Sequence, residues 1–212
     1  MPPKTKRLTK KEQQALLRRQ LLSNANQVVD FLVEFKAFSA YQMKNSEETM
    51  HLRSLHASAL TLEEREQIER LFCANMQTLY ENSSWGFDME KKRIELFEPE
   101  ARYIVVEHPR GQIEAFVHFR FVDDDGDPVV YIYEIQVSSN VQRQGVGKRL
   151  MQVVELVARK YKMKFIVLTV FKSNDQAMQF YMTKMGFEID ETSPSAQGDD
   201  SESYEILSKA LS

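Results

Sequence analysis

The stretch YIYEIQVSSNVQRQGVGKRL, residues 131–150, decides the fold of this 212-residue chain. Its first seven residues are rich in aromatic and β-branched side chains, which predicts a strand. After the glycines, apolar residues recur at positions 146, 150, 153, 154 and 157, a spacing that predicts a helix. A glycine loop between a strand and a helix gathers backbone amides at the positive end of the helix dipole, so it can bind a diphosphate.

The spacing of the two glycines excludes two known kinds of phosphate-binding loop. Leu150 stands where the dinucleotide fingerprint has its third glycine, and the long spacing of a P-loop is missing. Residues 142–147, QRQGVG, match the Gln/Arg-x-x-Gly-x-Gly/Ala loop that binds the pyrophosphate of acetyl-CoA in the GNAT acetyltransferases, which this chain resembles. A plain glycine-containing turn between strand and helix is the alternative.

Composition bounds the class of protein. An apolar fraction of 42% can build a packed core, and no apolar run approaches the roughly 20 residues that a membrane span needs. No signal-peptide pattern is found at the N-terminus, so we expect a soluble protein of the cytoplasm and nucleus, without membrane association. The single cysteine, Cys73, cannot form an internal disulfide, and the four histidines lack metal-ligand spacing. No metal is expected.

Charge is distributed unevenly along the chain. The first twenty residues carry seven Lys or Arg and one Glu, a net +6, which leaves −9 for the rest of a chain whose total is −3. The acidic body favours a basic partner, whereas the basic arm could contact RNA, the ribosome or an import receptor. A solvated, disordered tail is the equally weighted alternative for the arm.

The order of the predicted elements indicates an α/β protein. We expect a disordered basic tail over residues 1–9, an N-terminal helical extension packed on the domain over 10–60, and the acetyltransferase domain over 61–212. Thr61 and Glu64 form a capping-box pattern before a helix that ends near residue 82, and Ser173 and Gln176 form another. The helices and strands predict a GNAT fold, a mixed, mostly antiparallel sheet with flanking helices.

Glu134 is the candidate general base. It interrupts an apolar and aromatic strand, and strict alternation places it on the face opposite Tyr131, Tyr133, Ile135 and Val137. A carboxylate in such a strand is unfavourable unless it is used or paired, and burial should raise its pKa toward the range useful for a base. The alternative is a structural ion pair with a neighbouring arginine such as Arg102 or Arg120.

A more specific resemblance runs from about residue 70 to residue 208. Eight segments in order look like the NatD N-α-acetyltransferases: 75–80 (NMQTLY), 84–86 (SWG), 118–121 (HFRF), 131–134 (YIYE), 168–172 (LTVFK), 187–190 (FEID), 193–195 (SPS) and 203–207 (SYEIL). These enzymes acetylate the N-terminal serine of histone four and histone two-A, which begin Ser-Gly-Arg-Gly. An α-amine titrates near 7.7–8, against about 10.4 for lysine, so such a substrate needs little base assistance.

The resemblance assigns roles to individual residues. It implies that the backbone of Ile135, Gln136 and Val137 binds the pantetheine arm of acetyl-CoA. It implies that the pyrophosphate is bound by Arg143, Gln144, Gly145, Val146, Gly147 and Lys148, and that Asn174 contacts the cofactor near the last helix. The groove for the histone tail would be lined by Tyr80, Trp85, Tyr133, Thr169 and Tyr204, and Glu134 would act as a water-assisted base.

One position departs from the NatD pattern. The family has an acidic residue directly after Phe-Arg-Phe, where this chain has Val122 followed by Asp123. Either Asp123 replaces that second catalytic carboxylate through a shifted turn, or Glu134 works alone. Tyr181 could protonate the leaving thiolate, as in the wider superfamily, or could be an ordinary aromatic residue on a helix face.

The expected function is acetyl transfer from acetyl-CoA to the N-terminal serine of these histone tails by a monomer that could also associate with the ribosome. The acidic runs at 123–125 and 199–202 would attract the arginine of the tail. Two alternatives stay open: a lysine-side-chain acetyltransferase of the same fold, and an inactive adaptor that binds the ribosome or chromatin.

Overall fold

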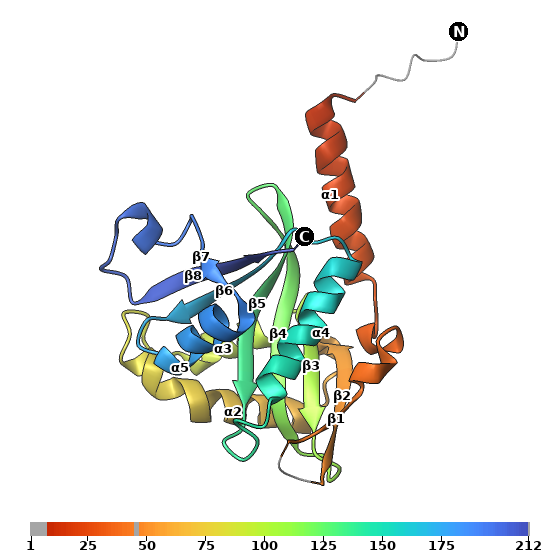
Figure 1. Cartoon of the computed structure of the whole chain (residues 1–212), viewed down its shortest axis with the longest axis vertical. Coiled ribbons are helices and arrows are strands. Elements are labelled where there is room, and N and C mark those ends of the chain that lie inside the picture. Colours follow the sequence, from red (N-terminus) through yellow and green to blue (C-terminus); the bar gives the residue numbers. More distant parts are fainter. Residues whose placement is uncertain (1–7, 45–46, 212) are drawn as a thin grey trace.

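The structure, a computed structural model, describes residues 8–44 and 47–211. A mixed sheet of eight strands runs through the molecule in the order β1-β2-β3-β4-β5-β6-β8-β7 (Figure 1). Neighbouring strands are antiparallel except β5 and β6, which are parallel. The strands are β1 Ala40–Gln42, β2 Thr49–His56, β3 Arg102–Glu107, β4 Ile113–Asp124, β5 Asp127–Val137, β6 Phe165–Phe171, β7 Glu188–Ile189 and β8 Tyr204–Ala210. This is the GNAT fold that the order of predicted elements indicated.

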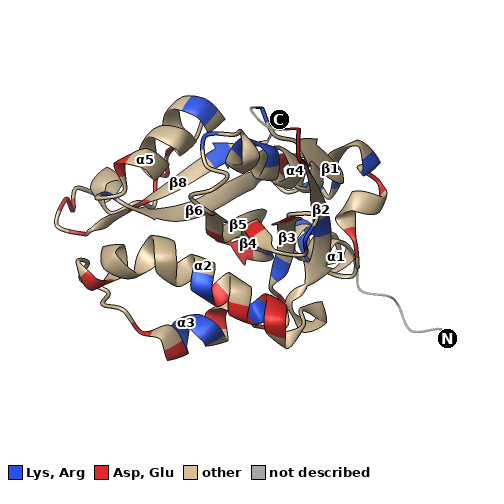
Figure 2. Cartoon of the chain, turned by 90° about the horizontal axis from the view of Figure 1, so that it is seen from below, with Lys and Arg blue, Asp and Glu red and all other residues tan. Residues whose placement is uncertain are grey.

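Helices cover both faces of the sheet (Figure 2). The α-helices are α1 Lys10–Asn26, α2 Leu62–Glu81, α3 Met89–Leu96, α4 Val146–Lys160 and α5 Asp175–Gln179. α4 buries its apolar stripe, including Leu150 and Val154, in the larger of two cores. α2 and α3 cover the other face, where Phe72 and Leu96 pack around Tyr103 of β3 in the second core. Burying apolar side chains on both faces is what fixes the position of the central strands.

Two predicted helix starts have different outcomes. The capping box of α2 is confirmed, because the Glu64 amide donates to the Thr61 hydroxyl at 3.2 Å and the Thr61 amide donates to the Glu64 carboxylate at 2.7 Å. The capping box predicted at Ser173 is wrong. Asn174 is the cap instead, since its side-chain oxygen accepts from the Ala177 amide at 3.2 Å. α5 then continues directly into a π-helical segment, Phe180–Met185.

The expected helical extension over residues 10–60 is only partly helical. α1 ends at Asn26, and residues 49–56 form β2, which pairs with β3 inside the sheet. Burial alternates along β2, with Met50 and Leu52 buried and His51 and Arg53 exposed, so the strand has the period of two that a half-buried strand requires. The predicted tail over residues 1–9 lies mostly outside the described residues.

The C-terminal end of α1 lies against the body of the protein, and the N-terminal end of this helix projects away from the body (Figure 1). Ala25 is fully buried, whereas Leu16 and Leu17 are exposed. Arg18, near the middle of the helix, forms an ion pair with Asp123 at the end of β4. Within residues 8–44 and 47–211, no helix is both long and apolar enough to cross a membrane.

Candidate active site

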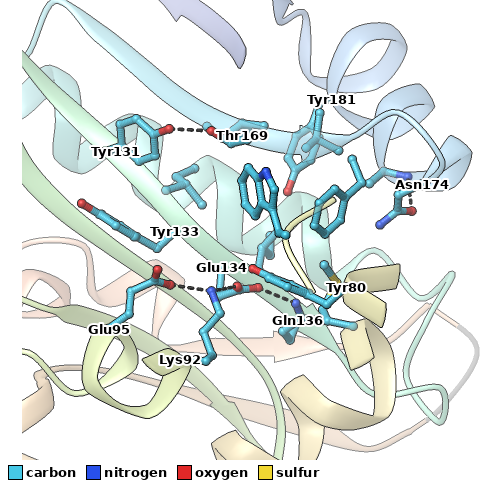
Figure 3. A pocket seen from close by; sticks show the side chains of 18 residues that line it. Tyr80, Lys92, Glu95, Tyr131, Tyr133, Glu134, Gln136, Thr169, Asn174 and Tyr181 are labelled. Atoms are coloured by element: carbon cyan, nitrogen blue, oxygen red, sulfur yellow. Dashed lines mark hydrogen bonds and ion pairs between the residues drawn. The ribbon is translucent and has the colours of Figure 1, made fainter. Parts of the chain in front are cut away.

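A gap between the two parallel strands contains a cavity. The β5–β6 ladder ends at Ile132 and Leu168; beyond this point β5 continues along β4 alone and β6 continues along β8. A cavity of about 310 Å³ occupies the gap, lined by β5, β6, α2, α3 and the segment around Tyr181 (Figure 3). In the described sheet, residues 133–137 have no strand on their β6 side. The backbone N–H and C=O groups of this segment that point toward β6 therefore have no strand to bond to. An extended ligand could supply the missing hydrogen bonds.

A β-bulge decides which side chains enter this cavity. His118 pairs with Glu134 and Phe119 pairs with Ile132, so Tyr133 is an extra residue on β5. One inserted residue resets the alternation, and Tyr131, Tyr133, Glu134 and Gln136 therefore all line the cavity. The prediction that Glu134 lies on the face opposite Tyr131 and Tyr133 is wrong for this reason, whereas Ile135 and Val137 do pack on the other face, against the larger core.

Glu134 is paired with a lysine from α3. Lys92 Nζ lies 2.8 Å from Glu134 Oε1, and the two side chains are 9% and 5% exposed. Gln136 Nε2 donates to the other carboxylate oxygen at 2.7 Å. Figure 3 shows these groups side by side at the floor of the cavity. Neither arginine suggested as an alternative partner is the one that Glu134 contacts: Arg102 bonds to the carbonyl of Val28 and Arg120 pairs with Glu98.

The environment of the pair shifts both pKa values. Burial raises the pKa of Glu134, and the charge and hydrogen bond of Lys92, together with the bond from Gln136, counter part of that rise. Burial alone would lower the pKa of Lys92, but attraction to Glu134, Tyr80 and Glu95 outweighs it and the pKa is raised. Lys92 therefore stays cationic, and the raised pKa of Glu134 suits a group that accepts a proton near neutral pH.

Four of the five residues predicted to bind the substrate lie at the cavity. Tyr80, Trp85, Tyr133 and Thr169 all line it. Tyr204 stands outside the lining and packs on Trp85, with ring centroids 5.1 Å apart. Burial, followed by the nearby charge of Glu134, raises the pKa of Tyr80 to about 12, so its hydroxyl stays a hydrogen-bond donor at neutral pH.

Next to the predicted Thr169 and Tyr133 lie three residues that were not predicted for the site, Tyr131, His118 and Arg120. The hydroxyls of Tyr131 and Thr169 are hydrogen-bonded at 2.6 Å. Two neighbours from β4 contact Tyr133: the ring of His118 stacks on it with centroids 5.0 Å apart, and the guanidinium of Arg120 lies 4.1 Å from its ring centroid. Burial holds the pKa of His118 well below its usual value, so this imidazole is neutral.

The glycine loop leads into α4 in the conformation that a diphosphate cradle requires. Gly145 has φ +90° and caps the helix, and the first intrahelical bond runs from the Arg149 amide to the Gly145 carbonyl at 3.0 Å. The amides of residues 146–148 thus have no acceptor within the helix. A Cβ at position 145 would collide with the hydroxyl of Tyr41, which donates to the Gln144 carbonyl at 2.6 Å. The loop therefore fits the diphosphate of acetyl-CoA.

The other residues predicted to bind the cofactor lie partly at the cavity and partly at the glycine loop. Ile135, Gln136 and Asn174 line the cavity. The Val137 carbonyl already accepts hydrogen bonds from Asn75 at 3.2 Å and Gln142 at 3.0 Å. At the loop, Arg143 reaches Gln176 at 3.4 Å. Six of the expected cofactor residues, Arg143, Gln144, Gly145, Val146, Gly147 and Lys148, belong to the loop and the first turn of α4.

Asp123 is not brought to the cavity. It lies five residues along β4 from His118, the partner of Glu134, which is roughly 16 Å in an extended strand. Its carboxylate pairs with Arg18 and accepts from the Gly126 amide at 3.0 Å, as expected of a residue that shapes a hairpin turn. The structure therefore does not support the prediction of Asp123 as a catalytic residue, and the carboxylates that line the cavity are Glu134 and Glu95.

Two residues that support Glu134 were not predicted from the sequence. Asn75 donates to Gln136 Oε1 at 2.9 Å and thus supports the group that holds Glu134. Lys92 lies in a charged helix and was not distinguished from its charged neighbours. It stands four residues before the buried Leu96 and so shares the face of Leu96, a spacing that could have identified it. Among the described residues, no cluster of three or more His, Cys, Asp or Glu is placed to hold a metal ion.

Comparison with known proteins places this arrangement in a family. The model of the acetyltransferase (GNAT) family matches residues 65–187. The N-alpha-acetyltransferase daf-31 of Caenorhabditis elegans is 28% identical over 108 residues, which are 50% of this chain and 59% of that protein, so the chain spans about three fifths of its length.

Solved structures share the fold at low identity. The GNAT domain of S. lividans PAT superposes with a TM-score of 0.60 at 13% identity, covering 81% of this chain and 96% of that one. Arabidopsis thaliana Naa50, in complex with a bisubstrate analogue, gives a TM-score of 0.53 at 18% identity, covering 75% and 98%. With the family match extending over more than half of its residues, the chain belongs to the GNAT acetyltransferase family.

Proposed function

We propose that this chain is an N-α-acetyltransferase of the NatD type, which transfers acetyl from acetyl-CoA to the N-terminal serine of histone four and histone two-A. The observation that carries the proposal is the buried carboxylate of Glu134 at the floor of a small, aromatic-walled cavity between diverging strands. The relationship to an N-alpha-acetyltransferase of Caenorhabditis elegans supports the same class of activity.

The cavity suits a short, polar chain terminus. Tyr80 and Tyr131 present hydroxyls among aromatic, aliphatic and polar side chains, which enclose a small residue and offer hydrogen bonds to its backbone. An α-amine is partly neutral near pH 8, so a single carboxylate of raised pKa is enough to accept the one proton that the amine loses when it attacks. A lysine side chain, with a pKa of about 10.4, would need more help from the site.

The proposed step uses one base. Glu134 accepts, directly or through one water, the proton that the amine loses as its nitrogen attacks the acetyl carbonyl; the C–N bond forms and the C–S bond breaks. Tyr181 lines the cavity, and burial raises its pKa, so it donates a hydrogen bond to the sulfur. A full proton transfer from so weak an acid to a thiolate is uphill. We therefore assign the thiolate's proton to solvent.

The arginine at the third position of the substrate needs a carboxylate near the cavity. Glu95 pairs with Lys92, but it lines the cavity and its side chain is 37% exposed, whereas Asp123 pairs with Arg18 and does not line the cavity. We therefore propose Glu95, rather than the acidic turn at 123–125, as the group that attracts this arginine. Ribosome association through the basic arm, a monomeric state and location in the cytoplasm and nucleus are further parts of the proposal; residues 1–7 of the arm lie outside the described structure.

The test is an acetylation assay with matched peptides. The protein and acetyl-CoA are incubated with a Ser-Gly-Arg-Gly peptide that also contains lysine, with the same peptide blocked at its α-amine, and with a Ser-Gly-Ala-Gly peptide. We expect acetyl on the free α-amine, none on the blocked peptide, and slower reaction without arginine. Acetylation of lysine in the blocked peptide would make this a lysine acetyltransferase. Binding of acetyl-CoA without transfer to any peptide would make it an adaptor.

A further inference from the structure

The ion pair at the cavity floor is unusual in being almost excluded from solvent. Lys92 and Glu134 come from α3 and β5 and are 9% and 5% exposed. A buried ion pair can often be replaced by apolar side chains with no loss of stability, so folding alone does not require a lysine at this position. The contacts of the two side chains indicate the role of the positive charge of Lys92.

The ammonium of Lys92 is surrounded by partners. Nζ bonds to Glu134 at 2.8 Å and to Glu95 at 2.5 Å. It also lies 5.1 Å and 5.2 Å from the ring centroids of Phe72 and Tyr80, within the range of cation–π attraction. α2, α3 and β5 thus all fix the ammonium in place.

The carboxylate of Glu134 is fixed at both oxygens. Lys92 holds Oε1, and Gln136 holds Oε2 at 2.7 Å while accepting a bond from Asn75 of α2 at 2.9 Å. A carboxylate with both oxygens bound keeps one orientation, which is the geometric requirement for a base acting on a bound amine.

The remaining charges near Glu134 cannot replace this lysine. Arg120 and His118 come from β4, but Arg120 is paired with Glu98 and His118 is neutral. Glu95 of α3 has no cationic group, and Tyr80 of α2 and Tyr181 have raised pKa values and stay neutral. Lys92 is therefore the cation that opposes the effect of burial on Glu134.

We propose that Lys92 is a positioning residue for acetyl transfer, whose ammonium keeps the Glu134 carboxylate ionised and aimed into the cavity at neutral pH. It acts through Glu134 and transfers no proton itself. The proposal rests on the proposed function for the role of Glu134 as the base. Its consequence is that an uncharged residue at position 92 moves the base to a higher pKa.

The first test compares pH profiles. kcat is measured between about pH 6 and pH 10 with the Ser-Gly-Arg-Gly peptide for the wild type, Lys92→Met and the control Lys91→Met, whose side chain is exposed on the same helix. We expect the acidic limb of the kcat profile of Lys92→Met to move to higher pH by about one unit or more. At pH 7 its kcat should be about tenfold lower than that of the wild type, and at high pH the difference should disappear. Lys91→Met should follow the wild type, and Lys92→Arg should restore most of the profile. A Lys92→Met profile that superimposes on the wild type would refute the proposal.

The second test does not depend on activity. The carboxyl carbon of Glu134, assigned by its loss in Glu134→Gln, is followed by NMR titration in the wild type and in Lys92→Gln, which keeps a hydrogen-bond donor without charge and serves if Lys92→Met does not fold. A higher pKa of Glu134 in Lys92→Gln supports the role of Lys92 even if the wild type leaves the peptide unacetylated, a result that would overturn only the proposed function. An unchanged pKa of Glu134 would overturn the role of Lys92.

Discussion

Replacement of Gly145 by alanine tests the diphosphate cradle. Gly145 has φ +90°, and an L-residue in the left-handed region costs about 1–2 kcal/mol. The added Cβ would also displace the Tyr41 hydroxyl and break its bond to the Gln144 carbonyl, a loss of about 0.5–1.5 kcal/mol. Together these terms cost about 1.5–3.5 kcal/mol, and a loop that relieves this strain by leaving the binding conformation should bind acetyl-CoA about 10- to 350-fold more weakly.

The assay is isothermal calorimetry with acetyl-CoA. Gly147→Ala is the matched control, because a Cβ there meets Phe180 at an ordinary 3.6 Å and needs no positive φ. We expect Gly147→Ala to bind within a few-fold of the wild type. Equal affinity of Gly145→Ala and the wild type would show that the loop does not hold the cofactor, and the reasoning would fail.

Three further predictions follow from the site. Glu134→Gln should lower kcat by about 10²- to 10⁴-fold while acetyl-CoA affinity in calorimetry stays unchanged, since a base acts on the amine; weakened cofactor binding would instead indicate a structural role. Asp123→Asn should change kcat/KM by less than about twofold, because its ion pair with Arg18 is partly exposed and distant from Glu134; a large loss would return Asp123 to the site. The lowered pKa of His118 means that the unfolded chain binds a proton the folded chain does not, so stability should fall below about pH 6.5 by up to about 1.4 kcal/mol per pH unit. Urea unfolding of His118→Phe should show a smaller dependence on pH, and an unchanged dependence would contradict this account.

The sequence predicted the parts of the fold that depend on local patterns. The strand, glycine loop and helix over residues 131–160 follow from β-branched content, two glycines and a 3.6-residue period, and all three are present. β2 was missed because its exposed face carries His51 and Arg53, which leave too few apolar positions to reveal a strand.

Parts of the site depend on tertiary contacts that have no local signal. The bulge at Tyr133 involves neither glycine nor proline, yet it moves Glu134 to the other face of β5. The distance from Asp123 to Glu134 is set by the register of β4 against β5. Lys92 approaches Glu134 across 42 residues of sequence, because α3 packs against the face of the sheet that carries the cavity.

The central claim is that the gap between β5 and β6 brings the acetyl group and a free α-amine together beside Glu134. A crystal structure with a bisubstrate analogue, CoA joined through an acetyl group to Ser-Gly-Arg-Gly, tests it most directly. The account predicts the serine nitrogen within hydrogen-bonding distance of the Glu134 carboxylate, directly or through one water, and the diphosphate on residues 143–148. Density for the analogue elsewhere, or a gap filled by the protein's own side chains, would contradict it.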